Sequence, residues 1–211
     1  IINEKGLDVE EVSKYKLEHG KVEGFPDSQF IKNGNDALEH PCDILIPAAM
    51  EGVITHENAP RIQAKVLAEA ANGPVTYEAD QILNEKDIFI IPDAYLNAGG
   101  VTVSYFEWLK NLSHVRFGRM DRRFVEAQGQ KIIEAIESGI GKSLAQVAKD
   151  KLLAGPSEID LVRSGLDDTM RVAYSEIKEQ QLSNNLINER RTAAYALAIR
   201  NIADIYESMY L

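Results

Sequence analysis

The chain has 211 residues, 45% of them apolar, with 23 Lys and Arg against 33 Asp and Glu and a formal net charge of −10. This composition is typical of globular proteins. Its acidity argues against nucleic acid or an anionic membrane surface as a partner, since both attract basic patches. No apolar run approaches the roughly 20 residues of a membrane span, so no membrane partner is expected.

Cysteine and histidine usage narrows the chemistry. Cys42 is the single cysteine and cannot form an internal disulfide, and four scattered histidines show no metal-ligand spacing. We therefore predict no metal site. The start, Ile1-Ile2, has neither an initiator Met nor the zones of a signal peptide. These features favour a cytoplasmic protein or, given the missing Met, a piece of one.

Residues 8–20 predict the first helix. Asp8 suits the N-cap, Glu11 stands where a capping box places its acidic residue, and Gly20 suits the C-terminal stop. Three short apolar runs follow, at 43–47, 65–69 and 88–92. Each is apolar at consecutive positions, the pattern of strands covered on both faces in a parallel sheet.

The spacing of these runs indicates how they connect. Ile44, Leu67 and Ile90 lie 23 residues apart in each case. A strand, a crossover and a parallel strand need about this length. Residues 76–86, with Thr76 as the N-cap, form an amphipathic helix pattern between the second and third runs. The predicted fold class is therefore α/β, with a doubly wound parallel sheet.

The sequence pattern changes near residue 98, where short apolar runs give way to long stretches with helical periodicity, so a helical region is expected after the predicted sheet. Val101, Tyr105 and Trp108 share one stripe of the first helix in this region, and Ser157 can cap a long later one. The helices are expected at residues 101–112, 121–137, 142–153, 158–180 and 188–210.

Small residues follow each predicted strand, at 47–49, 70–74 and 92–100, and the last two segments also contain an Asn, at 72 and 97. In open parallel sheets, ligands bind outside the carboxyl ends of the strands. Small residues let a flat ligand approach the backbone, and an Asn amide both donates and accepts hydrogen bonds. Asn-Gly-Pro and Asn-Ala-Gly-Gly are also ordinary turn sequences. Three such ends in one sheet favour a ligand edge over turns alone.

The same residues carry a family resemblance. The run Cys42 to Ala49, the segment Ala71-Asn72-Gly73-Pro74, the long run Asn97 to Trp108 and the segment Arg191 to Tyr195 resemble the coenzyme domain of glutamate dehydrogenases, in the Glu/Leu/Phe/Val dehydrogenase superfamily. The resemblance implies a partial Rossmann-type sheet with C-terminal helices. It also implies oxidative deamination of L-glutamate to 2-oxoglutarate and ammonia, with NAD or NADP as hydride acceptor.

The resemblance assigns five residues to the cofactor. Ala48 and Ala49 would line its adenosine side, Ala71 and Asn72 would lie near the nicotinamide ribose, and Asn97 would contact the nicotinamide amide. Two further residues would face the substrate: Val101 would pack beside it, and Ser104 would bind its side-chain carboxylate. Without the resemblance, a helical serine is expected to bond back to a carbonyl one turn earlier.

The resemblance covers only the C-terminal half of the family's enzyme. No Gly-x-Gly-x-x-Gly turn occurs in the chain. In the family that turn lies upstream, as do the catalytic lysine and aspartate, so no catalytic residue is predicted here. Residues 1–112 would form an incomplete dinucleotide-binding domain, and 113–211 helices packing on it, with a short or absent antenna near 119–156. The full-length enzyme would be a homo-oligomer, a hexamer.

Two departures from the family pattern and two alternatives belong beside this reading. Ala70 stands where the family usually has Gly, and Val75 where it usually has Thr; an Ala there could alter the backbone at the cofactor edge. One alternative is a Leu, Phe or Val dehydrogenase, against which Ser104 argues because a polar group suits a carboxylate better than an alkyl chain. The other is a non-catalytic α/β interaction module.

Overall fold

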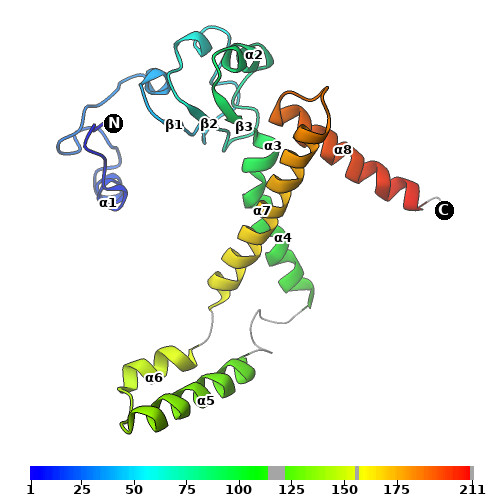
Figure 1. The fold of residues 1–211 in the computed structure, drawn as a ribbon. Coiled ribbons are helices and arrows are strands. Elements are labelled where there is room, and N and C mark those ends of the chain that lie inside the picture. The colour runs from blue at the N-terminus through cyan, green and yellow to red at the C-terminus, as the bar shows by residue number, and fades with distance from the viewer. Residues whose placement is uncertain (114–121, 155–156, 210–211) are drawn as a thin grey trace. The chain divides into compact units, whose positions relative to one another are not determined.

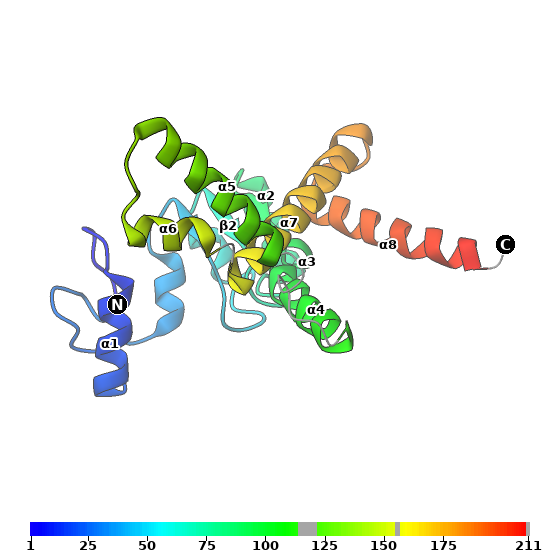
Figure 2. The same cartoon turned by 90° about the horizontal axis from the view of Figure 1, so that it is seen from below.

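The structure is a computed structural model that describes residues 1–113, 122–154 and 157–209. The chain divides into two compact units, Ile1–Asp93 and Ala94–Leu211. Figures 1 and 2 draw the elements of both. The division of roles between residues 1–112 and 113–211 stays a prediction.

The first unit contains a three-stranded parallel sheet, as predicted. Strands β1 (Ile44–Leu45), β2 (Val66–Ala68) and β3 (Phe89–Ile91) lie in the order β1-β2-β3, with β2 in the middle (Figure 1). Leu67 of β2 pairs with Leu45 of β1 on one side and with Ile90 of β3 on the other. The α/β fold class is thereby confirmed.

The core of this unit lies around β2 and helix α2 (Tyr77–Glu85). Leu67 on β2 and Leu83 on α2 are both fully buried, together with Ile54 and Ile62 from the loops. Burial of each such side chain stabilises the fold by about 1.5–3 kcal/mol. The predicted cap of α2 is present, because the Thr76 hydroxyl accepts from the Ala79 N–H at 3.4 Å.

Strand β1 departs from the expectation of cover on both faces. Ile44 is 59% exposed and Ile46 is 56% exposed, so the prediction of two-sided burial is wrong for residues 43–47 in the described structure. The connection from β1 to β2 explains the difference. It contains only one short 3-10 turn, η2 (Ala59–Arg61), and no crossover helix of the length that α2 provides between β2 and β3.

The start of the chain forms the predicted first helix, α1 (Val9–His19). The Asp8 carboxylate accepts from the Glu10 and Glu11 N–H groups, and Gly20 ends the helix in the left-handed conformation. No residue of α1 is buried. A second short turn, η1 (Gly34–Glu39), follows.

In the second unit, α3 (Asp93–Leu96) leads into α4 (Ala98–Ser113), and α7 (Glu158–Ser183) packs against both α4 and α8 (Arg190–Met209). The predicted Ser157 cap of α7 is confirmed as a full capping box with Asp160. A Cβ added to Gly165 would meet the Phe106 ring at 3.3 Å, so this glycine allows the close approach of α4 and α7. The predicted stripe of α4 is exposed, at Val101, Tyr105 and Trp108.

Helices α5 (Arg122–Ile140) and α6 (Gln146–Leu153) pack together as a helical pair (Figure 2). They confirm the helices expected in this part of the predicted antenna region; residues 119–121 and 155–156 of that region lie outside the described residues. None of the described helices of the chain combines the length and apolarity that crossing a membrane needs.

The turn between α5 and α6 is held by one carboxylate. Glu137 Oε1 accepts from Lys149 Nζ at 2.7 Å, from Ser143 Oγ at 2.8 Å and from the Leu144 N–H at 2.8 Å. The bond from Lys149, followed by those from Leu144 and Ser143, lowers the pKa of Glu137 from 4.5 to about 2. The ionised carboxylate is thus favoured by folding.

The lowered pKa of Glu137 predicts a pH-dependent contribution to stability. A carboxyl group whose folded pKa is depressed stabilises the fold above its unfolded pKa, and this contribution is lost as pH falls from about 4.5 to about 2. The difference in melting temperature between the wild type and Glu137→Gln should therefore be largest near pH 6 and shrink steadily below pH 4.5. Glu134→Gln, an exposed neighbour on α5, is the control, and an equal pH dependence in both variants would contradict the prediction.

The exposed isoleucines of β1 predict self-association of the 211-residue chain. An uncovered edge strand with apolar side chains offers a template for pairing with another copy. We expect the purified chain to form dimers or larger species at micromolar concentration in sedimentation experiments. Ile46→Lys, which places a charge at this edge, should shift it toward monomer. A wild type that stays monomeric with a cooperative unfolding transition would refute the prediction.

Candidate functional site

The carboxyl ends of the three strands are joined into one edge. The Ala70 N–H, just after β2, donates to the Pro47 carbonyl, just after β1, at 3.0 Å. On the other side, the Glu69 N–H donates to the Ile91 carbonyl of β3 at 3.1 Å. The three strand ends therefore form a continuous hydrogen-bonded border, and its role as a ligand edge stays a prediction.

This edge brings together the four candidate residues of the first unit. Ala48 and Ala49 follow the buried Pro47 and are exposed, while Ala71 is half-buried and Asn72 is exposed. Ala48 and Ala71 each lie one residue beyond the bonded pair Pro47 and Ala70, so the two candidate segments leave the sheet side by side. Their small side chains leave the backbone within reach of a flat ligand.

The turn after β2 is fixed by its backbone. Gly73 has φ +52°, a left-handed conformation that favours glycine. Its carbonyl accepts from the Gly52 N–H at 2.8 Å, and its own N–H donates to Asp93 Oδ2 at 2.9 Å. Among the described residues, the non-glycine positive φ angles are at Asp27 and Asp87, so Ala70 has an ordinary backbone and the departure from the family's Gly causes no strain here.

Two carboxylates at this edge were not predicted from the sequence. Glu69 is 0% exposed at the end of β2, and its Oε2 accepts from the Asp93 N–H at 2.8 Å. Asp93, two residues after the end of β3, in turn accepts from the Gly73 N–H. The sequence did contain a signal for Glu69. It ends an apolar run that is predicted to be buried, and a buried Glu almost always has a partner.

The other candidate residues belong to the second unit. Asn97 lies between α3 and α4, and its carbonyl accepts from the Gly100 N–H at 3.3 Å. Val101, 67% exposed, and Ser104 are three positions apart on α4 and therefore share a face. The Ser104 hydroxyl donates to the Gly100 carbonyl at 3.2 Å, the back-bond expected of a helical serine.

The structure thus places Ala48, Ala49, Ala71 and Asn72 together in the first unit, and Asn97, Val101 and Ser104 along one short segment of the second. Among the described residues, no group of three His, Cys, Asp or Glu side chains is arranged to hold a metal ion.

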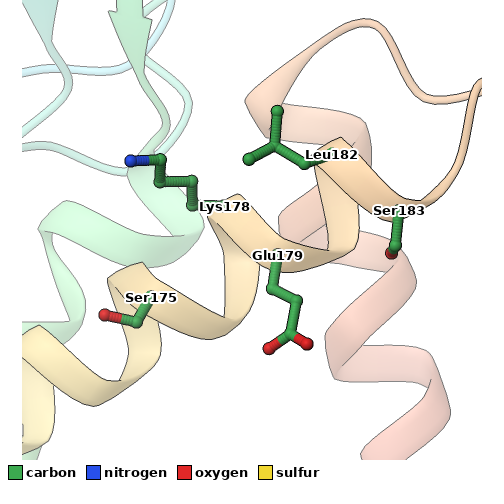
Figure 3. Close-up of a pocket in the computed structure, with 5 residues that line it drawn as sticks. All are labelled: Ser175, Lys178, Glu179, Leu182 and Ser183. Atoms are coloured by element: carbon green, nitrogen blue, oxygen red, sulfur yellow. The ribbon is translucent and has the colours of Figure 1, made fainter.

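A shallow hollow lies apart from these residues in the sequence, on the surface of α7 (Figure 3). Its lining residues all come from that one helix, and Figure 3 shows Lys178 and Glu179 pointing away from each other. The hollow contains no predicted site residue. The lining residues are Ser175, Lys178, Glu179, Leu182 and Ser183.

Sequence comparisons identify relatives along almost the whole chain. It is 49% identical over 208 residues to the mitochondrial glutamate dehydrogenase of Dictyostelium discoideum, which covers 99% of this chain and 41% of that protein. It is 45% identical over 205 residues to a probable glutamate dehydrogenase of Sinorhizobium fredii, covering 97% of this chain and 46% of that protein. The chain therefore spans less than half the length of these relatives.

Solved structures show the same kinship. The glutamate dehydrogenase of Peptoniphilus asaccharolyticus aligns with 100% of this chain and 37% of its own length, at 26% identity and a TM-score of 0.54. A hetero-hexameric glutamate dehydrogenase of Thermus thermophilus aligns with 97% of this chain and 38% of its own, with a TM-score of 0.61, and at 19% identity it supports the fold alone.

The family assignment depends on a match to a family model over more than half of the chain. Residues 1–155, which include the joined strand ends and every candidate residue, match the family described as Glutamate/Leucine/Phenylalanine/Valine dehydrogenase. The chain belongs to the Glutamate/Leucine/Phenylalanine/Valine dehydrogenase family.

Proposed function

We propose that this chain is the coenzyme-contacting part of a glutamate dehydrogenase. The reaction is the oxidative deamination of L-glutamate to 2-oxoglutarate and ammonia, with hydride transfer to NAD or NADP. One observation carries the proposal: the bond from the Ala70 N–H to the Pro47 carbonyl joins segments 47–49 and 70–73 at one sheet edge, in a chain 49% identical to a glutamate dehydrogenase. Ligands of open α/β sheets bind at such edges.

The residues at the edge fit a nicotinamide dinucleotide. Ala48 and Ala49 are exposed and small, which suits the flat adenosine side of the cofactor. Ala71 and the exposed Asn72 would lie near the nicotinamide ribose, where an amide can both donate to and accept from a hydroxyl group. Asn97 would bind the nicotinamide amide. When bound, the cofactor supplies the hydride acceptor, and these residues supply its position.

Val101 and Ser104 are proposed to face the amino-acid substrate. Val101 would pack against its aliphatic part, and Ser104 would donate to its side-chain carboxylate. The Ser104 hydroxyl has one hydrogen, which it donates to Gly100 in this structure. Binding a carboxylate therefore requires the hydroxyl to rotate away from Gly100, and the substrate bond replaces the back-bond.

The rest of the catalytic machinery would come from the part of the enzyme that this chain does not contain. The chain corresponds to 41% of the mitochondrial relative and 46% of the bacterial one, and we place the pyrophosphate turn and the catalytic side chains in the remaining portion. We propose a cytoplasmic enzyme that assembles as a homo-oligomer, a hexamer. The Thermus thermophilus structure is a hetero-hexamer, so it supports an oligomeric assembly and not the identity of the subunits.

A second candidate, dehydrogenation of leucine, phenylalanine or valine, is favoured by the breadth of the family description. The two functions differ in what the substrate side chain requires of residue 104. A hydroxyl group aimed at an alkyl chain would lose a hydrogen bond, whereas one aimed at a carboxylate gains a charge-assisted bond. Ser104 therefore favours glutamate.

The role of Ser104 predicts a selective loss of activity. In the complete enzyme, Ser104→Ala should lower kcat/KM for glutamate roughly ten- to a hundredfold, because a hydrogen bond to a charged group is worth about 1.5–3 kcal/mol. Norvaline, which lacks the carboxylate, should lose much less. Steady-state kinetics with both substrates measure the difference.

Two variants control this experiment. Ser175→Ala removes an equivalent back-bond, to the Arg171 carbonyl at 2.9 Å, on α7, a helix that carries no candidate residue, and should leave both substrates unaffected. Asn97→Ala should weaken cofactor use whichever substrate is offered. Equal losses for glutamate and norvaline in Ser104→Ala would make Ser104 structural.

The isolated 211-residue chain should show no glutamate-dependent reduction of NAD or NADP. The reason is that it carries only one side of the proposed active site, and hydride transfer needs groups that position the amino acid and accept its protons. Absorbance at the reduced-nicotinamide band measures turnover directly. Any sustained turnover that copurifies with the chain would overturn this prediction.

A further inference from the structure

We propose that Glu69 and Asp93 are positioning residues of the sheet edge: together they hold the turn that carries Asn72 in the orientation that a bound nicotinamide cofactor needs. The part of this inference that concerns the cofactor rests on the proposed function. The hydrogen bonds that link Glu69, Asp93 and Gly73 do not rest on it, because they are observed in the structure.

The two carboxylates form a relay from one strand end to the next and back. Glu69 follows β2 and Asp93 follows β3, and Glu69 Oε2 accepts from the Asp93 N–H at 2.8 Å. Asp93 Oδ2 then accepts from the Gly73 N–H at 2.9 Å, in the turn that follows β2. Along the chain, Asn72 therefore lies between Glu69 and Gly73, and both of these residues are hydrogen-bonded to Asp93.

The burial of Glu69 explains why this relay can fix the position of the Asp93 backbone. Glu69 is 0% exposed, and a buried carboxylate is costly unless its oxygens accept hydrogen bonds. Displacing the Asp93 N–H would leave a buried acceptor partly unsatisfied, at a cost well above the average hydrogen bond. The Asp93 backbone is thereby anchored, and its side chain becomes a fixed acceptor for Gly73.

Gly73 needs such an acceptor because its conformation leaves little else to define the turn. Its φ of +52° is compatible with glycine's broad freedom, and glycine loses more conformational entropy on ordering than other residues. Its N–H and carbonyl are held on two sides, by Asp93 and by the Gly52 N–H at 2.8 Å. Releasing one side would let residues 70–73 sample other conformations.

A ligand-binding amide must be held within a fraction of an ångström and a narrow range of angles to be effective. Asn72 has an exposed side chain, so burial does little to set its position. The relay supplies this restraint through the backbone on either side. The expected consequence is that loss of the relay weakens cofactor binding without altering the contacts that Asn72 itself can make.

The relay is tested first by amide hydrogen exchange on the 211-residue chain. In Asp93→Ala the Gly73 amide should exchange at least tenfold faster, whereas Asp93→Asn should stay within about threefold of the wild type, because its amide oxygen still accepts. The Ile54 amide, bonded to the Pro74 carbonyl at 2.9 Å, is the internal control and should stay protected in all variants. Unchanged Gly73 exchange in Asp93→Ala, or equal acceleration in Asp93→Asn, overturns the relay.

The link to the cofactor is tested in the complete enzyme. Asp93→Ala should raise KM for NAD or NADP about tenfold and change KM for glutamate less than twofold, and Asp93→Asn should restore most of the cofactor affinity. Glu78→Ala removes an exposed acid from the first turn of α2 and is the matched control. Equal changes in both KM values, or no rescue by Asn, overturn the positioning role.

The two readouts separate this inference from the proposed function. If the complete wild-type protein shows no glutamate-dependent reduction of NAD or NADP, the proposed function fails, and the exchange of the Gly73 amide still decides whether the relay exists. If the enzyme is active but Asp93→Ala has wild-type KM for its cofactor, the proposed function stands and the positioning role is wrong.

Discussion

The middle strand, β2, is the element on which the first unit depends. It pairs with β1 on one side and β3 on the other, and its Leu67 is fully buried in the core. The two residues that follow β2, Glu69 and Ala70, donate backbone hydrogen bonds to Ile91 of β3 and to Pro47, beyond β1, respectively. One segment of five residues thus sets the core, the order of the strands and the geometry of their carboxyl ends.

The buried carboxylate of Glu69, at the end of this strand, carries a desolvation cost that lowers the stability of the fold. An apolar residue at position 69 would extend the buried run of β2 without any desolvation cost. Glu69 instead uses its Oε2 to fix the Asp93 N–H at 2.8 Å. Residues that break the local pattern of a fold are expected where function requires a defined geometry. The edge of this sheet meets that expectation.

The sequence predicts much of the fold because several signals are local. The caps at Asp8, Thr76 and Ser157 each depend on residues within three positions, and the structure contains all three. The parallel pairing of Leu67 with Ile90 follows from a spacing that a crossover helix requires. These features need no knowledge of distant contacts.

Other features depend on contacts that a periodic pattern does not contain. The run around Ile44 and Ile46 is as apolar as the other strands, yet both side chains are exposed, because cover is decided by what packs on β1 and not by its own composition. The relay of Glu69 and Asp93 joins residues 24 positions apart, and no single position carries its signature. The candidate residues at the strand ends were found through small-residue turns and a resemblance, which do not reveal what holds those turns.

The candidate edge has a further physical consequence, which follows from its composition. Ala48, Ala49 and Ala71 contribute almost no side-chain chemistry, so a ligand there would be read mainly by backbone groups and by one amide, Asn72. Recognition by backbone depends on where the chain runs, and a small displacement changes every contact at once. If a ligand binds there as proposed, its selectivity would depend on the groups that hold the backbone. In this chain these groups are the Pro47 carbonyl, which accepts from the Ala70 N–H, and two carboxylates. Glu69 accepts from the Asp93 N–H, and Asp93 accepts from the Gly73 N–H.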